Sequence, residues 1–460
     1  MTLLAVRDLF VDFFTATRTI HAVRGVSFDV ASSERVGLVG ESGSGKTTTA
    51  LALMRMVKPP GKVVGGQAHL DAVDLLALNA REIREARLRL LFYVPPQIGC
   101  DLIMISPDMG LMAQVVDRVI VMQDGRIVED APVRELFGRP RHAYSRMLIE
   151  SVPSLDNRTE RPVRMRPAAV PERPVTQPLL AFHNVTKTFG GGLFAGPART
   201  ALQACSFQLT ADHPQITSVV GQSGSGKTTM ARMILGLEQP SSGSVLYRGA
   251  PLSGLSGKAT RDYHREVQTI FQDPYGSFNP FYKVDRTLAQ PIIQFGIATD
   301  RRAIYAAMEA CGAVGLAASE VLGRFPHELS GGQRQRLMVA RALALRPSLI
   351  VADEPVSMVD ASLRLTILGS MQALKTKHSI SIIYITHDLA TAYHVSDYVL
   401  VLHEGRIVEA GIPDDVIKRP GHPYTQTLVG AIPWPDPDRT LRGGGGTAML
   451  RRGRRGTRRR

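Results

Sequence analysis

The stretch Ile216-Thr-Ser-Val-Val-Gly221-Gln-Ser-Gly-Ser-Gly226-Lys227-Thr228 decides how this chain folds. Its apolar start predicts a short buried strand, and the residues after Thr228 predict a helix. A strand, a glycine-rich loop and a helix in this order are the context of a phosphate-binding loop. The glycines let backbone N–H groups surround a β-phosphate, while Lys227 offers its charge to the β- and γ-phosphate oxygens and Thr228 offers a hydroxyl to Mg²⁺. The stretch therefore predicts an α/β nucleotide-binding domain.

A second glycine-containing stretch, Leu329-Ser330-Gly331-Gly332-Gln333, is predicted to open a helix. Ser330 is a typical N-cap residue, and the two glycines allow the backbone to approach a ligand closely. Amide groups at the start of a helix bind phosphate. Alone, this stretch is more typical of an ordinary turn. In a chain with a phosphate loop it indicates a second phosphate-binding element.

Two further predicted strands end in residues that suit phosphate chemistry. The apolar run 349–352 leads to Asp353 and Glu354, and open α/β sheets bind ligands at the carboxyl ends of their strands. There Asp353 can hold Mg²⁺ and Glu354 can polarise a water for in-line attack, although an acidic strand-end cap is the alternative. The next apolar strand ends at His387, which either donates to a γ-phosphate or has a structural role.

Two other residues fit the same site less specifically. Phe189 either stacks on a purine ring or packs in the core. Gln272 either ligates Mg²⁺ and orients the attacking water, or is a surface amide. Residues 283–327 are predicted to be helical and carry no catalytic set. Their candidate core positions are Leu288, Ile292, Ile293, Ile304, Met308 and Val314.

Length and composition restrict the class of protein. The 460 residues allow about two to four domains. No run of about 18 apolar residues occurs, so no segment is expected to span a bilayer. The charged start is not typical of a signal peptide. The isolated Cys100, Cys205 and Cys311 fit a reducing cytoplasm and give no metal-ligand spacing.

The net charge of +14 is concentrated at one end. Residues 442–460 hold eight arginines and no acid, which leaves +6 for the rest of the chain. This Gly/Arg-rich end is predicted to be a disordered, solvated tail. Weak contact with lipid headgroups or RNA is a secondary interpretation, and no specific nucleic-acid partner is expected.

The chain repeats itself. Gly40-Glu-Ser-Gly-Ser-Gly45-Lys46-Thr47 returns 181 residues later as the loop 221–228. Near the ends of the copies, Asp124-Gly125-Arg126-Ile127 returns 280 residues later as Glu404-Gly405-Arg406-Ile407, and each is predicted to be a hairpin. The two offsets differ by 99, so the first copy lacks about 99 residues of its middle.

This ordered set of motifs resembles the ATP-binding cassette of ABC transporters. The run Arg419-Pro-Gly-His422-Pro-Tyr424-Thr425, with Asn279-Pro280 and the run 325–329, makes it similar to the oligopeptide/dipeptide importer ATPases. The resemblance implies a P-loop fold with a mostly parallel sheet, an antiparallel β rim and a helical subdomain. It implies a peripheral ATPase on the cytoplasmic face of the inner (plasma) membrane, docked on two permease subunits. A solute-binding protein delivers peptide in this family, and in some members nickel or glutathione.

The resemblance also assigns the site. In this family two cassettes pair head to tail, and ATP lies between the phosphate loop of one and the signature stretch, here 330–333, of the other. ATP contacts are implied for Phe189, Gly221, Gln222, Ser223, Gly224, Ser225, Gly226, Lys227, Thr228, Thr229, Ser330, Gly331, Gly332, Gln333 and Asp360, and in the first copy for Gly40, Gly43, Gly45, Lys46 and Thr47. Mg²⁺ is expected at Thr228, Gln272 and Asp353, and catalysis from Glu354, His387 and Gln272.

The first copy departs from the family pattern. It keeps Phe13 as a candidate stacking residue and a full phosphate loop, but the missing block would hold the helical region, the signature and the carboxylate pair. Gln97 is a candidate remnant of the Gln272 position, and Pro107 takes the place of His387. We expect residues 1–155 to form a truncated cassette, 156–178 a Pro-rich linker, 179–438 a complete cassette and 439–460 a disordered tail.

Pairing of the two copies within one chain would leave both composite sites incomplete. We therefore expect the second copy to be an active transport ATPase that obtains a signature in trans, from a homodimer or a partner cassette. One alternative is a decayed or regulatory ATP-binding protein without turnover. Another is a soluble tandem-cassette ATPase that acts on ribosomes or nucleic acid.

Overall fold

The computed structural model describes residues 2–15, 18–71, 73–79, 81–84, 102–106, 108–152, 178–190, 197–271, 276–356, 361–433 and 435–438. Gln97, Pro107, Gln272 and Asp360, nearly all of the predicted linker and the whole predicted tail lie outside these residues. The chain divides into two compact units. Unit 1 comprises Met1–Ser154, Asp360–Ser362 and Pro433–Arg460, and unit 2 comprises Leu155–Val359 and Leu363–Ile432.

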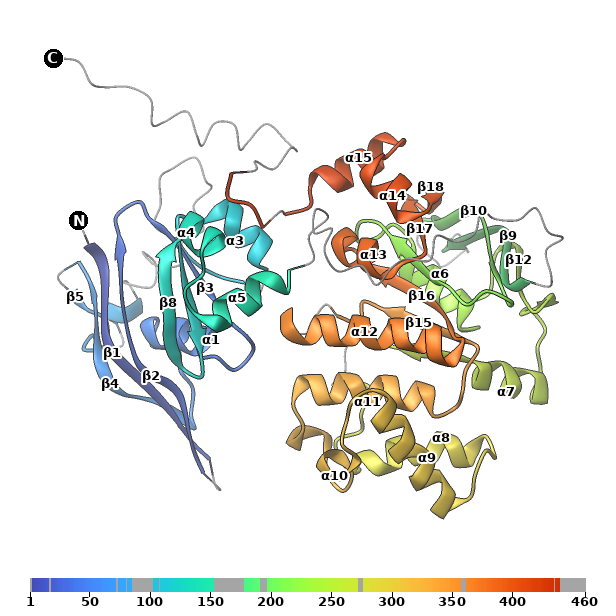
Figure 1. Cartoon of the computed structure of the whole chain (residues 1–460), viewed down its shortest axis with the longest axis horizontal. Helices are drawn as coiled ribbons and strands as arrows, with labels where there is room; N and C mark the ends of the chain where they lie inside the picture. Colours follow the sequence, from blue (N-terminus) through green and yellow to red (C-terminus); the bar gives the residue numbers. More distant parts are fainter. Residues whose placement is uncertain are drawn as a thin grey trace. The chain divides into compact units, whose positions relative to one another are not determined.

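Unit 2 carries the second copy of the repeat (Figure 1). Its strands are β9 (Pro178–Phe189), β10 (Arg199–Thr210), β11 (Ile216–Val220), β12 (Ser242–Tyr247), β13 (Ala250–Pro251), β14 (Val267–Ile270), β15 (Leu349–Asp353), β16 (Ser381–Thr386), β17 (Tyr398–His403) and β18 (Arg406–Gly411). Its helices are α6 (Lys227–Ile234), α7 (Gly257–Glu266), α8 (Val284–Gln294), α9 (Asp300–Ala313), α10 (Ala318–Val321), the 3₁₀ helix η1 (Pro326–Glu328), α11 (Gly331–Leu343), α12 (Ala361–His378), α13 (Leu389–Val395), α14 (Pro413–Lys418) and α15 (Pro423–Gly430).

Two sheets form the centre of unit 2. The larger has the order β14-β15-β16-β11-β17-β18, with parallel pairing from β14 to β17 and an antiparallel edge at β18. The smaller, β10-β9-β12-β13, is antiparallel. Strands β11 and β16 are buried along their whole length, as expected for parallel strands that are covered on both faces. This order brings the carboxyl ends of β15, β16 and β11 to one edge, where the phosphate loop begins.

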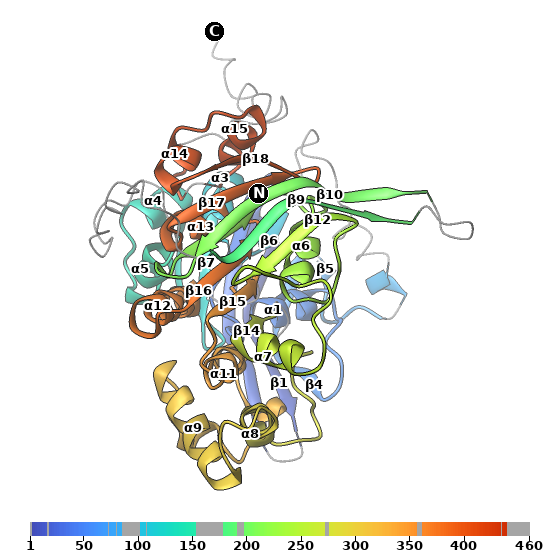
Figure 2. The same ribbon diagram turned by 90° about the vertical axis from the view of Figure 1, so that its right-hand side faces the viewer.

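The helices α8 to α11 gather at one end of unit 2 in both views (Figures 1 and 2). The predicted core positions Leu288, Ile292 and Val314 are buried there, and Ile293 is partly buried. The prediction for Ile304 and Met308 is wrong, because these side chains are 46% and 42% exposed. Helix α9 instead turns Ala303, Ala307 and Ala310 inward. Small side chains let a helix approach its neighbours closely, so the alanine face rather than the larger apolar residues makes the contact.

Unit 1 repeats part of this plan. Its strands are β1 (Thr2–Phe14), β2 (Thr19–Ala31), β3 (Arg35–Val39), β4 (Gly61–Leu70), β5 (Val73–Asp74), β6 (Leu102–Ile105), β7 (Arg118–Gln123) and β8 (Arg126–Pro132). Its helices are α1 (Lys46–Leu53), α3 (Met109–Val115), α4 (Val133–Gly138) and α5 (Ala143–Glu150). The order β6-β3-β7-β8 corresponds to β16-β11-β17-β18 in unit 2. Among the strands that the structure describes, β6 is an edge, whereas β16 continues into β15 and β14.

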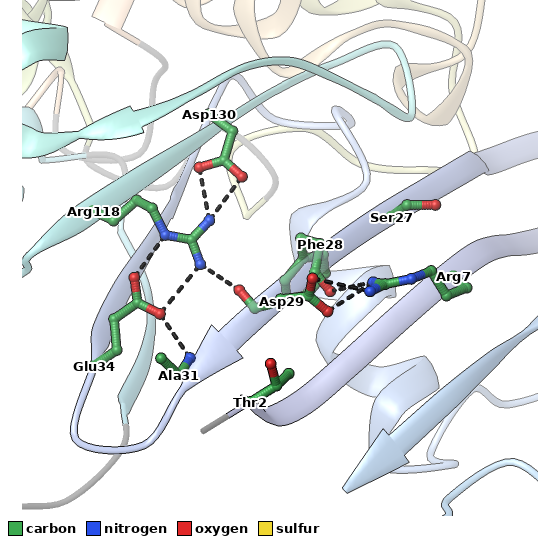
Figure 3. Close-up of a pocket in the computed structure, with 9 residues that line it drawn as sticks. All are labelled: Thr2, Arg7, Ser27, Phe28, Asp29, Ala31, Glu34, Arg118 and Asp130. Carbon is green, nitrogen blue, oxygen red and sulfur yellow. Dashed lines mark hydrogen bonds and ion pairs between the residues drawn. The ribbon is translucent and has the colours of Figure 1, made fainter. Parts of the chain in front are cut away.

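An ion cluster joins the two sheets of unit 1 (Figure 3). Arg118 on β7 lies 2.7 Å from the carboxylate of Glu34 and 2.7 Å from that of Asp130 on β8, and it also donates to the backbone carbonyl of Asp29 on β2. Arg7 on β1 forms an ion pair with the Asp29 carboxylate at 2.7 Å. A cavity of about 420 Å³ lies beside this cluster. The cluster ties the antiparallel sheet, of order β2-β1-β4-β5, to the mixed sheet, of order β6-β3-β7-β8.

Candidate active site

The phosphate loop of unit 2 joins β11 to α6 as the sequence predicts. Gly221 has φ +154°, and a Cβ atom there would lie 2.2 Å from the backbone carbonyl oxygen of Leu402 in β17. At Gly226, φ is +108°, and a Cβ atom would lie 2.5 Å from the carbonyl oxygen of Ala201. Only glycine fits both backbone positions without moving a neighbouring strand. At these two glycines the loop backbone therefore lies directly against β17 and β10.

Lys227 is buried within this loop. Its Nζ donates to the carbonyl oxygens of Gly221 (2.7 Å) and Gln222 (2.8 Å). Burial lowers its pKa, and the negative charges of Glu354 and Asp353 oppose that effect. The Oγ of Ser225 is buried and has no hydrogen-bond partner among the described residues. An ammonium group and an unpaired hydroxyl in a loop that opens a helix form a suitable environment for a phosphate.

A cavity of about 1100 Å³ opens in front of the loop. It brings together predicted site residues from the end of β9, the phosphate loop with the start of α6, and the ends of β15 and β16. Those lining it are Phe189, Ser223, Gly224, Gly226, Lys227, Thr228, Thr229, Asp353, Glu354 and His387. The cavity also has lining residues that the sequence reasoning missed: Arg199, Thr200, Ala201, Gln203, Glu404 and Gly405. These come from β10 and the β17–β18 hairpin, and no local motif identifies them.

The acidic residues and the histidine meet at adjacent strand ends. Asp353 pairs with Ile385 across β15 and β16, and the backbone N–H of Glu354 donates to the Ile385 carbonyl at 2.9 Å. The Nδ1 of His387 lies 2.7 Å from Oε1 of Glu354. Glu354 has φ +44°, a left-handed conformation that costs a non-glycine residue about 1–3 kcal/mol. The backbone is therefore held in a strained form at the residue whose carboxylate contacts the histidine.

The two carboxylates differ in their surroundings. Burial and the nearby charge of Glu354 raise the pKa of Asp353, while the Lys227 ammonium opposes this shift. A cation near Asp353 would favour its ionised form. The Thr228 hydroxyl and the Asp353 carboxylate line the same cavity, and Mg²⁺ prefers such oxygen ligands. The described residues therefore fit a bound Mg²⁺.

Phe189 lies at the rim of the cavity. It is 39% exposed at the end of β9, and the Lys187 ammonium lies 4.8 Å from its ring centroid. Core packing, one of the two interpretations of Phe189, is therefore excluded. Phe13, at the corresponding place in unit 1, is partly buried against a core cluster that includes residues of β1, β2 and β4.

The signature stretch lies at the N-terminus of α11. The Ser330 Oγ accepts from the Gln333 N–H at 3.2 Å, and the Gln333 side chain accepts from the Ser330 N–H at 3.0 Å, which completes a capping box. None of the described residues that line the cavity of about 1100 Å³ comes from this stretch. The next turn of α11 is linked to the segment that follows Asp353 and Glu354, since the buried side chain of Gln335 donates to the Pro355 carbonyl at 2.6 Å. Sequence reasoning gave Gln335 no role.

Unit 1 reproduces the phosphate loop. The Lys46 Nζ donates to the carbonyls of Gly40 (2.8 Å) and Glu41 (2.6 Å) and to Ser44 Oγ (3.1 Å). Asp108 caps α3 as Asp388 caps α13, which supports the predicted match between β6 and β16. The described part of unit 1 has no strand in the position of β15, the strand that carries Asp353 in unit 2.

Comparison with known proteins identifies the family. The sequence profile described as ABC transporter matches residues 23–97 and 202–357. The chain belongs to the ABC transporter family. A second profile, that of the C-terminal region of oligopeptide/dipeptide transporters, matches residues 128–177 and 408–453 of this ABC chain. The ABC match in unit 2 runs through Asp353 and Glu354, whereas the match in unit 1 ends at residue 97.

Similar proteins include glutathione import ATP-binding proteins named GsiA. That of Pectobacterium atrosepticum is 30% identical, and the alignment covers 95% of this ABC chain and 90% of the relative. That of Escherichia coli K12 is 29% identical with the same coverage. Both alignments run over more than 560 positions (569 and 565), so the relatives have residues that this 460-residue chain lacks.

Solved structures of ABC cassettes are also similar to part of the chain. The dimeric cassette MJ0796, bound to ADP and phosphate in a post-hydrolysis state, is 25% identical with a TM-score of 0.46, covering 51% of this chain and 98% of that one. The cassette cbiO1 from Clostridium perfringens, part of the ABC transporter complex cbiONQ, is 22% identical with a TM-score of 0.47, covering 53% and 92%.

The predicted ABC family and the α/β P-loop cassette fold are thus confirmed. The chain is an ATP-binding subunit with ATPase activity in an ABC importer of the oligopeptide/dipeptide type, a class that works with membrane permeases. Within the part of the chain that the structure describes, no helix has the length and apolar character needed to cross a membrane.

Proposed function

We propose that unit 2 hydrolyses ATP, with Mg²⁺, to drive the import of peptides or of a peptide-like solute such as glutathione. The match to the oligopeptide/dipeptide C-terminal region and the names of the relatives support this class of cargo. The subunit would dock on two permease subunits at the cytoplasmic face of the inner membrane, and a solute-binding protein would deliver the cargo to them.

In this proposal the residues that line the cavity have different roles in ATP binding and hydrolysis. Lys227 leaves its two loop carbonyls and binds the β- and γ-phosphate oxygens. Thr228 and Asp353 would hold Mg²⁺, and the ion would neutralise charge on those phosphates. Glu354 polarises the attacking water, and His387 orients the Glu354 carboxylate and donates to the γ-phosphate. Phe189 at the rim stacks on the purine ring.

Unit 1 contributes a nucleotide-binding loop without the groups for hydrolysis. Its Lys46 is held as Lys227 is, so it suits phosphate binding equally well. The carboxylate pair lies at the carboxyl end of β15, a strand that has no counterpart among the described strands of unit 1. In unit 2, the signature stretch does not line the cavity of its own unit among the described residues. This supports a head-to-tail pairing in which a second cassette, from another copy of the chain or a partner ATPase, supplies the signature.

One observation carries this proposal. Glu354 and His387 are in contact at 2.7 Å, and both line the same cavity as the phosphate loop. The variant Glu354→Gln keeps the shape of the side chain and removes its basicity. We expect steady-state ATP hydrolysis to fall about 10²- to 10⁴-fold while ATP binding persists. Glu320→Gln, at an exposed position of α10, is the matched control and should keep full turnover. Unchanged turnover in Glu354→Gln would remove the basis of the proposal.

The incomplete phosphate site of unit 1 also favours a second role within this subunit, which is regulatory binding of ATP by unit 1 without turnover at its own loop. A single-turnover assay of the whole chain over a range of protein concentrations tests whether hydrolysis needs paired cassettes. Hydrolysis that rises more steeply than protein concentration indicates pairing. A rate strictly proportional to protein concentration counts against pairing.

A further inference from the structure

The same long-range hydrogen bond occurs in both units. In unit 2, the hydroxyl of Tyr424 accepts from the backbone N–H of Gln222 in the phosphate loop at 2.9 Å, across 202 residues of sequence. In unit 1, the hydroxyl of Tyr144 accepts from the backbone N–H of Glu41 at 2.8 Å, across 103 residues. The units have different lengths of chain between the two partners, and yet the contact is the same. It links the C-terminal element of each unit to the phosphate loop.

The C-terminal element holds this tyrosine firmly in unit 2. The Glu409 carboxylate on β18 accepts from the N–H groups of Gly421 (2.8 Å) and His422 (3.1 Å), and His422 Nδ1 accepts from the Tyr424 N–H at 3.2 Å. Burial works against the charge on Glu409, but hydrogen bonds outweigh it and lower its pKa. The ring of Tyr424 stacks on His403, with centroids 3.7 Å apart and an interplanar angle of 22°. The ring is therefore placed by contacts that do not involve its hydroxyl.

Unit 1 builds the same support. The Glu129 carboxylate on β8 accepts from the N–H groups of Arg141 (2.8 Å) and His142 (3.0 Å). His142 Nδ1 accepts from the Tyr144 N–H at 3.2 Å, and this caps α5. Alanine replaces proline between the histidine and the tyrosine without a change in these contacts. Two sequences that differ in length and detail thus converge on one arrangement around the tyrosine.

The contact fixes the part of the loop that holds the lysine. The Gln222 carbonyl accepts from Lys227 Nζ at 2.8 Å and from the Ser225 N–H at 3.2 Å. Its N–H is held by Tyr424, so the peptide groups on both sides of Gln222 are fixed. Gly221, which precedes it, has φ +154° and no side chain to restrict rotation of the shared peptide group. Without the tyrosine hydroxyl, this peptide group gains freedom, and the loop spends less time in the conformation that positions its amide groups and Lys227 for a phosphate.

We propose that Tyr424 is a positioning residue of the nucleotide site, through which the C-terminal element sets the affinity of the phosphate loop for ATP. The inference rests on the proposed function of unit 2 as the ATP site. Apparent affinity falls with the fraction of molecules in the binding-competent conformation, and the Tyr424 hydroxyl raises that fraction for the loop. Any partner or segment that shifts α14 and α15 would then change ATP affinity through this one hydrogen bond.

The test compares Tyr424→Phe with the parent by titration with MgATP, in the full chain carrying Lys46→Ala so that only the loop of unit 2 binds. Loss of one hydrogen bond should raise the Kd for MgATP about two- to tenfold. In hydrolysis assays KM should rise while kcat stays the same, because the hydroxyl touches no reacting group. Hydrogen exchange of the loop segment containing the Gln222 amide should become faster.

Tyr247→Phe is the matched control. It removes a tyrosine hydroxyl that donates to Glu266 at 2.7 Å in the same unit, and Tyr247 does not line the nucleotide cavity. It should leave the Kd and the exchange of the loop unchanged. An equal Kd in Tyr424→Phe and its parent, or an equal rise in Tyr247→Phe, overturns this inference. If the Lys46→Ala chain binds no MgATP at all, the proposed function of unit 2 fails instead, so the two failures are distinguishable.

Discussion

The two phosphate loops offer a matched pair of substitutions, Lys227→Met and Lys46→Met. Each lysine donates to two loop carbonyls at 2.6 to 2.8 Å, and Lys46 also donates to Ser44 Oγ at 3.1 Å, so the two substitutions remove nearly the same local contacts from the same chain. Methionine has an unbranched side chain of similar length and fills the same space. The loops should therefore keep their fold, and any difference between the variants should report on the nucleotide.

The size of the effect follows from the contact that is lost. A hydrogen bond to a charged group contributes about 1.5–3 kcal/mol, which corresponds to about a ten- to 150-fold change in affinity. Either variant should lose affinity for ATP at one of its two loops by this factor. Turnover should differ, because only Lys227 shares a cavity with Asp353, Glu354 and His387. Lys227→Met should lower hydrolysis at least tenfold and Lys46→Met should leave it near the parent value.

Two measurements on the purified full chain check this prediction. Equilibrium titration gives the number of nucleotides bound per chain, expected to be two in the parent and one in either variant at moderate ATP. Steady-state phosphate release gives turnover. A fall in turnover of the same size in Lys46→Met as in Lys227→Met would refute the division of labour between the units, since it would place unit 1 in the hydrolytic cycle.

Further predictions concern the stability of each unit. Burial opposes ionisation of Glu34, but its hydrogen bonds to Arg118 and the Ala31 N–H prevail and lower its pKa below the ordinary 4.5. A lowered folded-state pKa gives stability that is present above pH 4.5 and is lost as pH falls through the folded value. The melting temperature of Glu34→Gln should therefore depend less on pH in that acid range than the melting temperature of the parent. A Cβ atom at Gly221 would lie 2.2 Å from the Leu402 carbonyl oxygen, so Gly221→Ala should cost about 1–3 kcal/mol and lower the Tm of unit 2 by several degrees. Gly138→Ala, where a Cβ atom meets nothing within 4 Å, should leave the Tm unchanged.

Local sequence patterns were sufficient to predict the central parallel strands and the glycine loop at the nucleotide cavity of unit 2. The apolar runs before Gly221, Asp353 and His387 became the central parallel strands, because buried strands and strand-end loops follow from hydrophobicity and spacing. The hairpins at Gly125 and Gly405 were also predicted and are present. The capping box of Ser330 and Gln333 follows from their three-residue spacing.

Contacts between distant parts of the chain could not be predicted in this way. The hydrogen bond from Gln222 to Tyr424 and the one from Gln335 to Pro355 depend on which elements become neighbours. Ile304 and Met308 were assigned to the core on hydrophobicity, but α9 packs through its alanines. Burial of a side chain depends on how closely two helices approach each other, and this distance cannot be predicted from the sequence of one helix.

A complementation assay tests most directly whether one chain completes the site of another. Gly331→Asp places a carboxylate at the start of α11, where the fold leaves space, so it should repel phosphate without disturbing the helix. Chains with Gly331→Asp keep Glu354, and chains with Glu354→Gln keep the signature stretch, so each should be inactive alone. An equal mixture should form one complete site in half of its dimers and recover about a quarter of the parent ATPase rate. A mixture as inactive as its two components would contradict the account.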